Sequence, residues 1–86
     1  MHISVYSLKK VLYEDEAASV NCRTEAGEIT VLDKHAPLVT VLKTGAIKIV
    51  DKAGKDHYFN EISGFLEVSS KNHAKIIIDQ DGENRG

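Results

Sequence analysis

The sequence predicts an all-β fold, a small β-sandwich of about 8-10 short, mainly antiparallel strands. Three observations lead to this prediction. Apolar residues mostly recur with a period of two, no window sustains the three-and-four spacing of an amphipathic helix, and turn-forming residues separate the apolar runs at close intervals. The length of 86 residues allows one domain with a single modest core.

Two strands are predicted near the N-terminus, one starting around Ile3 and Val5 and one over residues 18–23. In the second, apolar side chains alternate with polar ones, as in a strand with one buried face. Cys22 is the one cysteine, so it cannot form an internal disulfide, and we interpret it as a core residue in a reducing, cytoplasmic setting. The side chains expected to point inward are Ala18, Val20 and Cys22.

The stretch from Lys9 to Ala18 leaves two interpretations open. Val11 to Tyr13 is apolar enough for a strand, whereas the acidic run Glu14-Asp15-Glu16 is more typical of a solvated turn. The charged run from Asp51 to Asp56 is also interpreted as a solvated turn.

A turn and a short strand follow the second strand. Glu25-Ala26-Gly27-Glu28 is turn-like, because Gly27 can adopt a positive φ at little cost. It leads into a strand over Ile29 to Leu32. Asp33-Lys34-His35 is then expected to form a loop.

The proline defines where the next strand begins. Pro37 lacks an N–H and restricts Ala36 to extended geometry, so the strand over Leu38 to Leu42 starts in a defined direction. The strand predicted last in the chain, Ala74 to Ile78, has apolar residues on both faces, which predicts a position inside a sheet. The remaining predicted strands include Ile47 and Ile49, His57 to Phe59, Phe65 to Val68 and Ala74 to Ile78, with turns at Asp51 to Gly54 and Ser69 to Asn72.

The residue types that most often carry catalysis or bind metal are scattered. The histidines show no ligand spacing, there is no second cysteine for a zinc site, and no glycine-rich phosphate loop exists. No catalytic residue, cofactor or metal is therefore expected. Each histidine is interpreted as a surface or partner-facing residue, and the four are His2, His35, His57 and His73.

The charge balance argues against two classes of partner. A net charge of -2, from 13 acidic and 11 basic residues that are mixed along the chain, attracts neither nucleic acid nor an anionic membrane surface. The apolar runs are far shorter than the roughly 20 residues that cross a bilayer. Any association with a membrane is expected to come through a partner.

Two motifs in order carry a family resemblance that spans nearly the whole chain. The first runs from Gly27-Glu28-Ile29 to His35-Ala36-Pro37-Leu38, followed by Thr40, and the second is Gly64-Phe65-Leu66-Glu67-Val68. In order and spacing they resemble the N-terminal β-sandwich of the epsilon subunit of F-type ATP synthases, called delta in mitochondria. The resemblance implies an epsilon-type β-sandwich domain over residues 1–78 and a flexible tail over 79–86. It also implies that Lys9 to Ala18 is strand.

The resemblance further implies a non-catalytic subunit of the central rotor, which links the gamma subunit to the c-ring so that ion flow couples to ATP synthesis. Its place would be the cytoplasmic face of the cell inner membrane, as a peripheral part of the complex. Carried over by position, the gamma-facing residues are Ser7, His35, Ala36, Pro37, Leu38 and Thr40. The residues carried over as c-ring-facing are Glu25, Gly27, Glu28 and Ile29.

The chain departs from the family pattern at several turns and at its end. Thr30 replaces a usual glycine, Asp33-Lys34 replaces Pro-Gly, and Ser63 stands where a first glycine is common. The sequence stops after the sandwich, so the two-helix domain that inhibits ATP hydrolysis in many relatives is not expected. This predicts a rotor subunit without self-inhibition by that route.

Two other functions stay open. One is a stand-alone β-sandwich module that binds an unrelated partner. The other is a small enzyme or metal-dependent protein whose scattered histidines and carboxylates converge in the fold.

Overall fold

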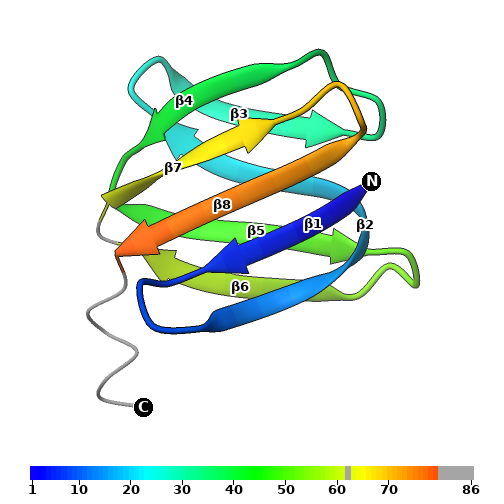
Figure 1. Cartoon of the computed structure of the whole chain (residues 1–86), viewed down its shortest axis with the longest axis horizontal. Helices are drawn as coiled ribbons and strands as arrows, with labels where there is room; N and C mark the ends of the chain where they lie inside the picture. Colours follow the sequence, from blue (N-terminus) through cyan, green and yellow to red (C-terminus); the bar gives the residue numbers. More distant parts are fainter. Residues whose placement is uncertain (62, 80–86) are drawn as a thin grey trace.

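The alternation of apolar and polar residues produces eight strands in the computed structural model, which describes residues 1–61 and 63–79 (Figure 1). Strand pairs are antiparallel except for β1 and β8, which run parallel. The predicted all-β class and mainly antiparallel pairing are confirmed. The strands are β1 (His2–Tyr6), β2 (Val11–Thr24), β3 (Gly27–Leu32), β4 (Leu38–Leu42), β5 (Gly45–Asp51), β6 (Asp56–Glu61), β7 (Ser63–Val68) and β8 (His73–Asp79).

The strands form two layers that share β2. Residues 11–16 of β2 pair with β1, which continues through β8 and β7 to β4, and Figure 1 shows these four strands side by side. Residues 17–24 of β2 pair instead with β3 and β5, and β5 pairs with β6. Its 14 residues make β2 long enough to serve both layers.

The core lies between the layers and is built from inward-pointing branched side chains. The cysteine belongs to it, as predicted, with no exposed surface. Ser4 and Thr24 are the polar residues that are buried in the described part of the chain. The largest fully buried apolar side chains are Ile3, Val5, Val20, Cys22, Val31, Ile47, Ile49, Leu66, Ile76 and Ile78.

The predicted inward position of Ala18 is wrong. The pairing of β2 with β5 shifts register between Ala17 and Ser19, and Ala17 is fully buried whereas Ala18 is exposed. An extra residue in one strand reverses which side chains face inward, because the side-chain period of a strand is two. The alternation beyond Ser19 is unaffected, so Val20 points inward as predicted.

The interpretation of Glu14-Asp15-Glu16 as a turn is also wrong. These residues lie inside β2 and pair with β1, and all three are exposed. The strand that the family resemblance implied over Lys9 to Ala18 is therefore confirmed from Val11 onward, whereas Lys9 and Lys10 lie in the turn before β2. The charged run after Asp51 does form the β5–β6 turn, in which the Asp51 carboxylate accepts hydrogen bonds from the amides of Ala53 and Lys55.

The end of the described chain extends slightly beyond the predicted domain boundary. Strand β8 includes Asp79, one residue past the predicted boundary at 78. The rest of the tail predicted over 79–86 lies outside the described residues. Within the described part, no helix has the length and apolar character needed to cross a membrane.

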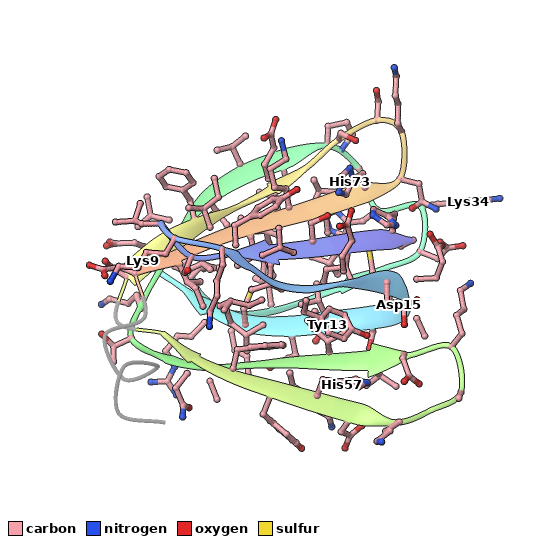
Figure 2. All side chains as sticks on the ribbon, turned by 60° about the horizontal axis from the view of Figure 1, so that its bottom comes forward. Lys9, Tyr13, Asp15, Lys34, His57 and His73 are labelled. Carbon is pink, nitrogen blue, oxygen red and sulfur yellow. The ribbon has the colours of Figure 1, made fainter. Side chains whose placement is uncertain are left out.

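Two aromatic side chains and a histidine join β2 to the edge strand β6. The ring of Tyr13 lies 4.9 Å from that of His57 and 5.8 Å from that of Phe59, measured between centroids, and Figure 2 labels Tyr13 beside His57. The Tyr13 hydroxyl is buried, and no described group forms a hydrogen bond with it. Burial is the main cause that raises the pKa of Tyr13, followed by the charges of Asp15 and Asp51.

Gly64 of β7 sits where the backbone of β8 passes closely. A Cβ atom at this position would collide with the carbonyl oxygen of Ile77 and lie 2.9 Å from the Cα of Ile78. Both obstacles are backbone atoms, so the rotation of a side chain cannot relieve the collision. The second glycine of the family motif is therefore required by the approach of two strands.

We predict that Gly64→Ala lowers the free energy of unfolding by about 1–3 kcal/mol, the usual cost of overpacking. Gly45→Ala is the matched control, because a Cβ there meets nothing closer than 3.9 Å. Urea unfolding of both variants checks this. Equal stability of the two would contradict the proposed close approach.

Tyr13→Phe is expected to raise the free energy of unfolding by about 1 kcal/mol, because it removes a buried hydroxyl that forms no hydrogen bond with any described group. Tyr58→Phe, at an exposed position, is expected to change it little. Thermal unfolding monitored by circular dichroism measures both. A loss of stability in Tyr13→Phe would show that the hydroxyl has a partner.

Candidate functional site

The loop between β3 and β4, which carries the predicted His35-Ala36-Pro37 segment, begins with a tight turn. The amide of His35 donates to the carbonyl oxygen of Leu32 at 3.1 Å, and Lys34 has a φ of 64°. Such a φ favours glycine, the residue that the family resemblance leads us to expect at this position. The turn therefore forms without the Pro-Gly pair, and its stabilisation must come from elsewhere.

Asn72, in the distant turn between β7 and β8, supplies that stabilisation. Its Oδ1 accepts from the amide of Lys34 at 2.6 Å, and its Nδ2 donates to Oδ1 of Asp33 at 2.7 Å. The amine of Met1 also donates to Oδ1 of Asp33, at 2.8 Å. The turn is thus held by contacts between segments that are far apart in the sequence.

These contacts lower the pKa of Asp33 to about 2, with the hydrogen bond from the N-terminal amine as the largest cause and that from Asn72 next. A carboxylate with a lowered pKa stabilises the fold above its unfolded pKa of about 3.9. This contribution is lost as the pH falls from about 4 towards 2. It is fully present at neutral pH.

The predicted gamma-facing residues lie at both ends of one layer. His35, Ala36 and Pro37 are exposed and precede Leu38, which pairs with the far end of β7. Ser7 follows Tyr6 at the opposite end of β1, and its hydroxyl accepts from the amides of the next turn at 3.2 and 3.3 Å. Figure 2 shows this separation through the labels of Lys9 and Lys34, at opposite ends of the molecule. The structure does not bring Ser7 together with the His35 loop.

Strand β4 points the two predicted residues Leu38 and Thr40 away from solvent. Both are half-buried, and Leu38 packs against the core. The alternating residues Val39 and Val41 point outward and are 73% and 53% exposed. Leu38 and Thr40 therefore lie on the inner side of β4, whereas Val39 and Val41 form its outer surface.

A row of apolar side chains crosses β4, β7, β8 and β1 on the side to which Val39 and Val41 point. Val41 pairs with Phe65, Phe65 with Ile77, and Ile77 with Tyr6, so the four side chains lie on one side of adjacent strands. Phe65 is 50% exposed, and Ile77 and Tyr6 are half-buried. We call the outward-pointing side of β4, β7, β8 and β1 the outer face.

Sequence reasoning did not select this row, although it left a signal. Strands β4 and β8 are apolar in both phases, and for β8 this pattern predicts a position inside a sheet. Strand β8 does pair on both edges, with β1 and β7, but Ile77 faces the outer face rather than the core. A strand covered on both faces and a strand covered on one face can have the same sequence pattern. They differ only in whether a second layer covers the outer face.

The predicted c-ring-facing residues form the hairpin between β2 and β3. The Thr24 hydroxyl donates to the carbonyl oxygen of Gly27 at 2.7 Å, and Gly27 has a φ of 119°, as expected for this turn. Glu25 and Glu28 are exposed, and Ile29 is half-buried against the core. Thr24 pairs with Leu42, the last residue of β4, and the same end of the layer continues through β7 and β8 to the end of β1. The hairpin therefore lies at the same end of the molecule as Ser7.

The four histidines lie on β1, on β6, on β8 and in the loop before Pro37. No group of three or more His, Cys, Asp or Glu side chains in the described chain is placed to hold a metal ion. His57 bonds to Oδ2 of Asp51 at 2.9 Å in the layer behind the outer face. The structure nevertheless brings together His2 and His73, which the sequence left far apart, because β1 and β8 pair in parallel.

We predict that Asn72→Ala lowers the free energy of unfolding by about 1–2 kcal/mol, because it removes two hydrogen bonds and leaves a non-glycine residue at a φ of 62°. Lys34→Gly is expected to raise it by about 0.5 kcal/mol, because glycine adopts the positive φ without strain. Urea unfolding measures both, with the exposed Lys71→Ala as control. Equal effects of Asn72→Ala and Lys71→Ala would show that the turn does not depend on Asn72.

Comparison with known proteins places this geometry in a family. The profile described as ATP synthase, Delta/Epsilon chain, beta-sandwich domain matches residues 1–81. The ATP synthase epsilon chain of Roseiflexus sp. is 33% identical over 79 residues, which cover 92% of this chain and 55% of the relative. That of Alkalilimnicola ehrlichii is 28% identical over 68 residues, covering 79% and 49%. The chain thus spans about half the length of the curated relatives it matches.

Solved structures show the same fold. A chain in the Euglena gracilis mitochondrial ATP synthase, in a structure of OSCP, F1 and c-ring, superposes with a TM-score of 0.83 at 22% identity, covering 88% of this chain and 48% of that one. A chain in the central stalk and c-ring of the Tetrahymena thermophila mitochondrial ATP synthase gives 0.77 at 19% identity, covering 92% and 63%. The match over residues 1–81 confirms the resemblance seen in the two motifs. The chain belongs to the family of β-sandwich domains of ATP synthase delta/epsilon chains.

Proposed function

We propose that this chain is a non-catalytic subunit of the central stalk of an F-type ATP synthase, which links the gamma subunit to the c-ring so that ion flow couples to ATP synthesis. The family and the similar chain in a central stalk and c-ring structure support this assignment. Its membrane association comes through the complex alone, at the cytoplasmic face of the inner membrane.

The observation that carries the proposal is the apolar row on the outer face. Val41, Phe65, Ile77 and Tyr6 form a contiguous stripe, and Val39 adds a further exposed side chain on β4. Contiguous exposed apolar surface on a small domain marks a protein interaction site. An apolar centre with charged residues around it is also the usual anatomy of a protein interface. The outer face is therefore the proposed surface for the gamma subunit.

The loops at both ends of this face complete the proposed interface. The exposed His35, Ala36 and Pro37 border one end, and Ser7 borders the other. A partner that lies across the four strands contacts both ends at once. This accounts for family positions that are far apart in the fold, while Leu38 and Thr40 act by supporting β4.

The β2–β3 hairpin is the proposed contact with the c-ring. Its exposed carboxylates, Glu25 and Glu28, are suited to pair with basic or amide side chains of polar loops. Gly27 provides the tight turn that presents them, and the half-buried Ile29 anchors the hairpin to the core. The hairpin projects from one end of the sandwich, so this contact leaves the outer face available for the gamma subunit.

A stand-alone module with an unrelated partner is the alternative function. The same apolar row would serve such a partner. A preference for the gamma subunit over unrelated proteins distinguishes the two.

We predict that Phe65→Asp weakens binding of the purified gamma subunit from the same source by at least about 10-fold, because it places a charge in the apolar row. Val39→Asp is the second test, because Val39 is 73% exposed and its replacement leaves the core intact. Tyr58→Asp is the matched control, because Tyr58 is 62% exposed on the other layer. Calorimetry measures the affinities.

Binding of the wild-type chain to the gamma subunit tests the proposed function itself. If the folded wild type does not bind the gamma subunit, the proposed function is wrong and the unrelated-partner alternative gains support. If Phe65→Asp and Val39→Asp bind as well as the Tyr58→Asp control, the outer face is not the interface.

A further inference from the structure

Two histidines from opposite ends of the sequence touch on the outer face. His2 of β1 is the register partner of His73 of β8, and their rings meet edge to face with centroids 4.8 Å apart and planes at 70°. The contact depends on the parallel pairing of the first and last strands. An unperturbed imidazole titrates in the physiological range, and two rings this close do not take up protons independently.

The surroundings of His2 favour its protonated form. Nε2 lies 3.0 Å from Oε2 of Glu14, and Nδ1 lies 3.2 Å from Oε2 of Glu16. Only an imidazolium donates from both ring nitrogens at once. The hydrogen bond with Glu14 is the largest cause that raises the pKa of His2, and Glu16 acts in the same direction.

The surroundings of His73 favour its neutral form. Nε2 lies 3.0 Å from Oγ of Ser4, a side chain with no exposed surface, and the hydroxyl can donate to a neutral ring. Burial is the main cause that lowers the pKa of His73, followed by the charges of His2 and Lys75. Glu14 and Glu67 oppose these effects but do not reverse them.

The remaining charged group at this corner is the amine of Met1. It lies 3.5 Å from Oε1 of Glu16 and 2.8 Å from Oδ1 of Asp33. Both carboxylates already have a cationic partner. They pair with this amine rather than with the ring of His73.

We propose that His2 and His73 form a proton-operated switch on the docking surface. With one proton, held by His2 between Glu14 and Glu16, β1 stays paired with β2 and β8. A second proton, taken from solvent by Nε2 of His73, places two cationic rings in contact. The repulsion weakens the β1–β8 pairing at this corner, beside the apolar row, to which β1 contributes Tyr6 and β8 contributes Ile77.

The switch rests on the proposed function in one respect. Because the outer face is the proposed surface for the gamma subunit, uptake of the second proton weakens docking at acid pH. The switch itself is a property of the chain and is measured without a partner.

The test within the chain compares wild type with His73→Gln and His2→Gln. A histidine with a lowered pKa takes up its proton more readily when unfolded, so it costs stability as the pH falls below about 6.5. The urea midpoint of wild type should therefore fall more between about pH 7.5 and pH 5.5 than that of His73→Gln. By NMR, the titration of the His73 ring should move to higher pH in His2→Gln, because the neighbouring cation is gone.

A purely structural role would move neither readout. His35→Gln, at an exposed loop position outside the cluster, is the control for the unfolding comparison. The switch is overturned if His73→Gln follows the wild-type pH dependence, or if the His73 titration is unchanged in His2→Gln.

The docking arm uses the purified gamma subunit at about pH 7.5 and pH 5.5. Wild type is expected to lose affinity at the lower pH by at least about 5-fold, and His73→Gln is expected to retain it. An equal pH effect on both chains, or none on wild type, overturns the regulation of docking. No binding at either pH, with the histidine titrations as expected, overturns the proposed function and leaves the switch in place.

Discussion

The double membership of β2 is the constraint on which the rest of the structure depends. This strand pairs with β1 in one layer and with β3 and β5 in the other, and its last residue meets β4. A strand that passes from one layer to the other must bend, and the register shift after Ala17 lies where β2 leaves β1 and joins β5. Without that extra residue, the inward set that includes Val20 and Cys22 would point to solvent.

The layer of β4, β7, β8 and β1 is built to expose one apolar side. Its inner side supplies Leu66, Ile76 and Ile78 to the core, and its outer side carries the apolar row. Gly64 lets β7 and β8 approach closely next to that row. The exposed part of this apolar side does not stabilise the isolated domain, because no second layer covers it, and a protein partner is the explanation that we propose.

The same layer also links the two chain ends of the described domain. The parallel pairing of β1 and β8 places His2 beside His73, and the nearby turn places Asn72 against Asp33 and Lys34. These contacts hold the loop that presents His35 and concentrate titratable groups at one corner. The loop and the histidine pair therefore share the same structural support.

The sequence alone determined the fold class and the family. Period-two alternation, the turn residues and the two motifs depend on local chain geometry, which neighbouring residues decide. They located the β2–β3 hairpin, the loop before Pro37 and the strand of Phe65 to Val68 within a residue or two. Residue patterns alone could not show the inward position of Ala17, and they favoured a turn at Glu14-Asp15-Glu16, where the family resemblance implied strand, because both features depend on pairing with β5 and β1.

Only the tertiary structure decided which side of each strand meets a second layer. By sequence pattern alone, four exposed or half-buried residues of the outer face resemble core residues: Val39, Val41, Phe65 and Ile77. The pattern of apolar residues is the same whether or not a second layer covers them. The contact of His2 with His73 and the role of Asn72 in the Asp33-Lys34 turn likewise join residues from distant parts of the chain. Local patterns record the period of a strand, but its neighbours across the sheet and between the layers are set by long-range packing.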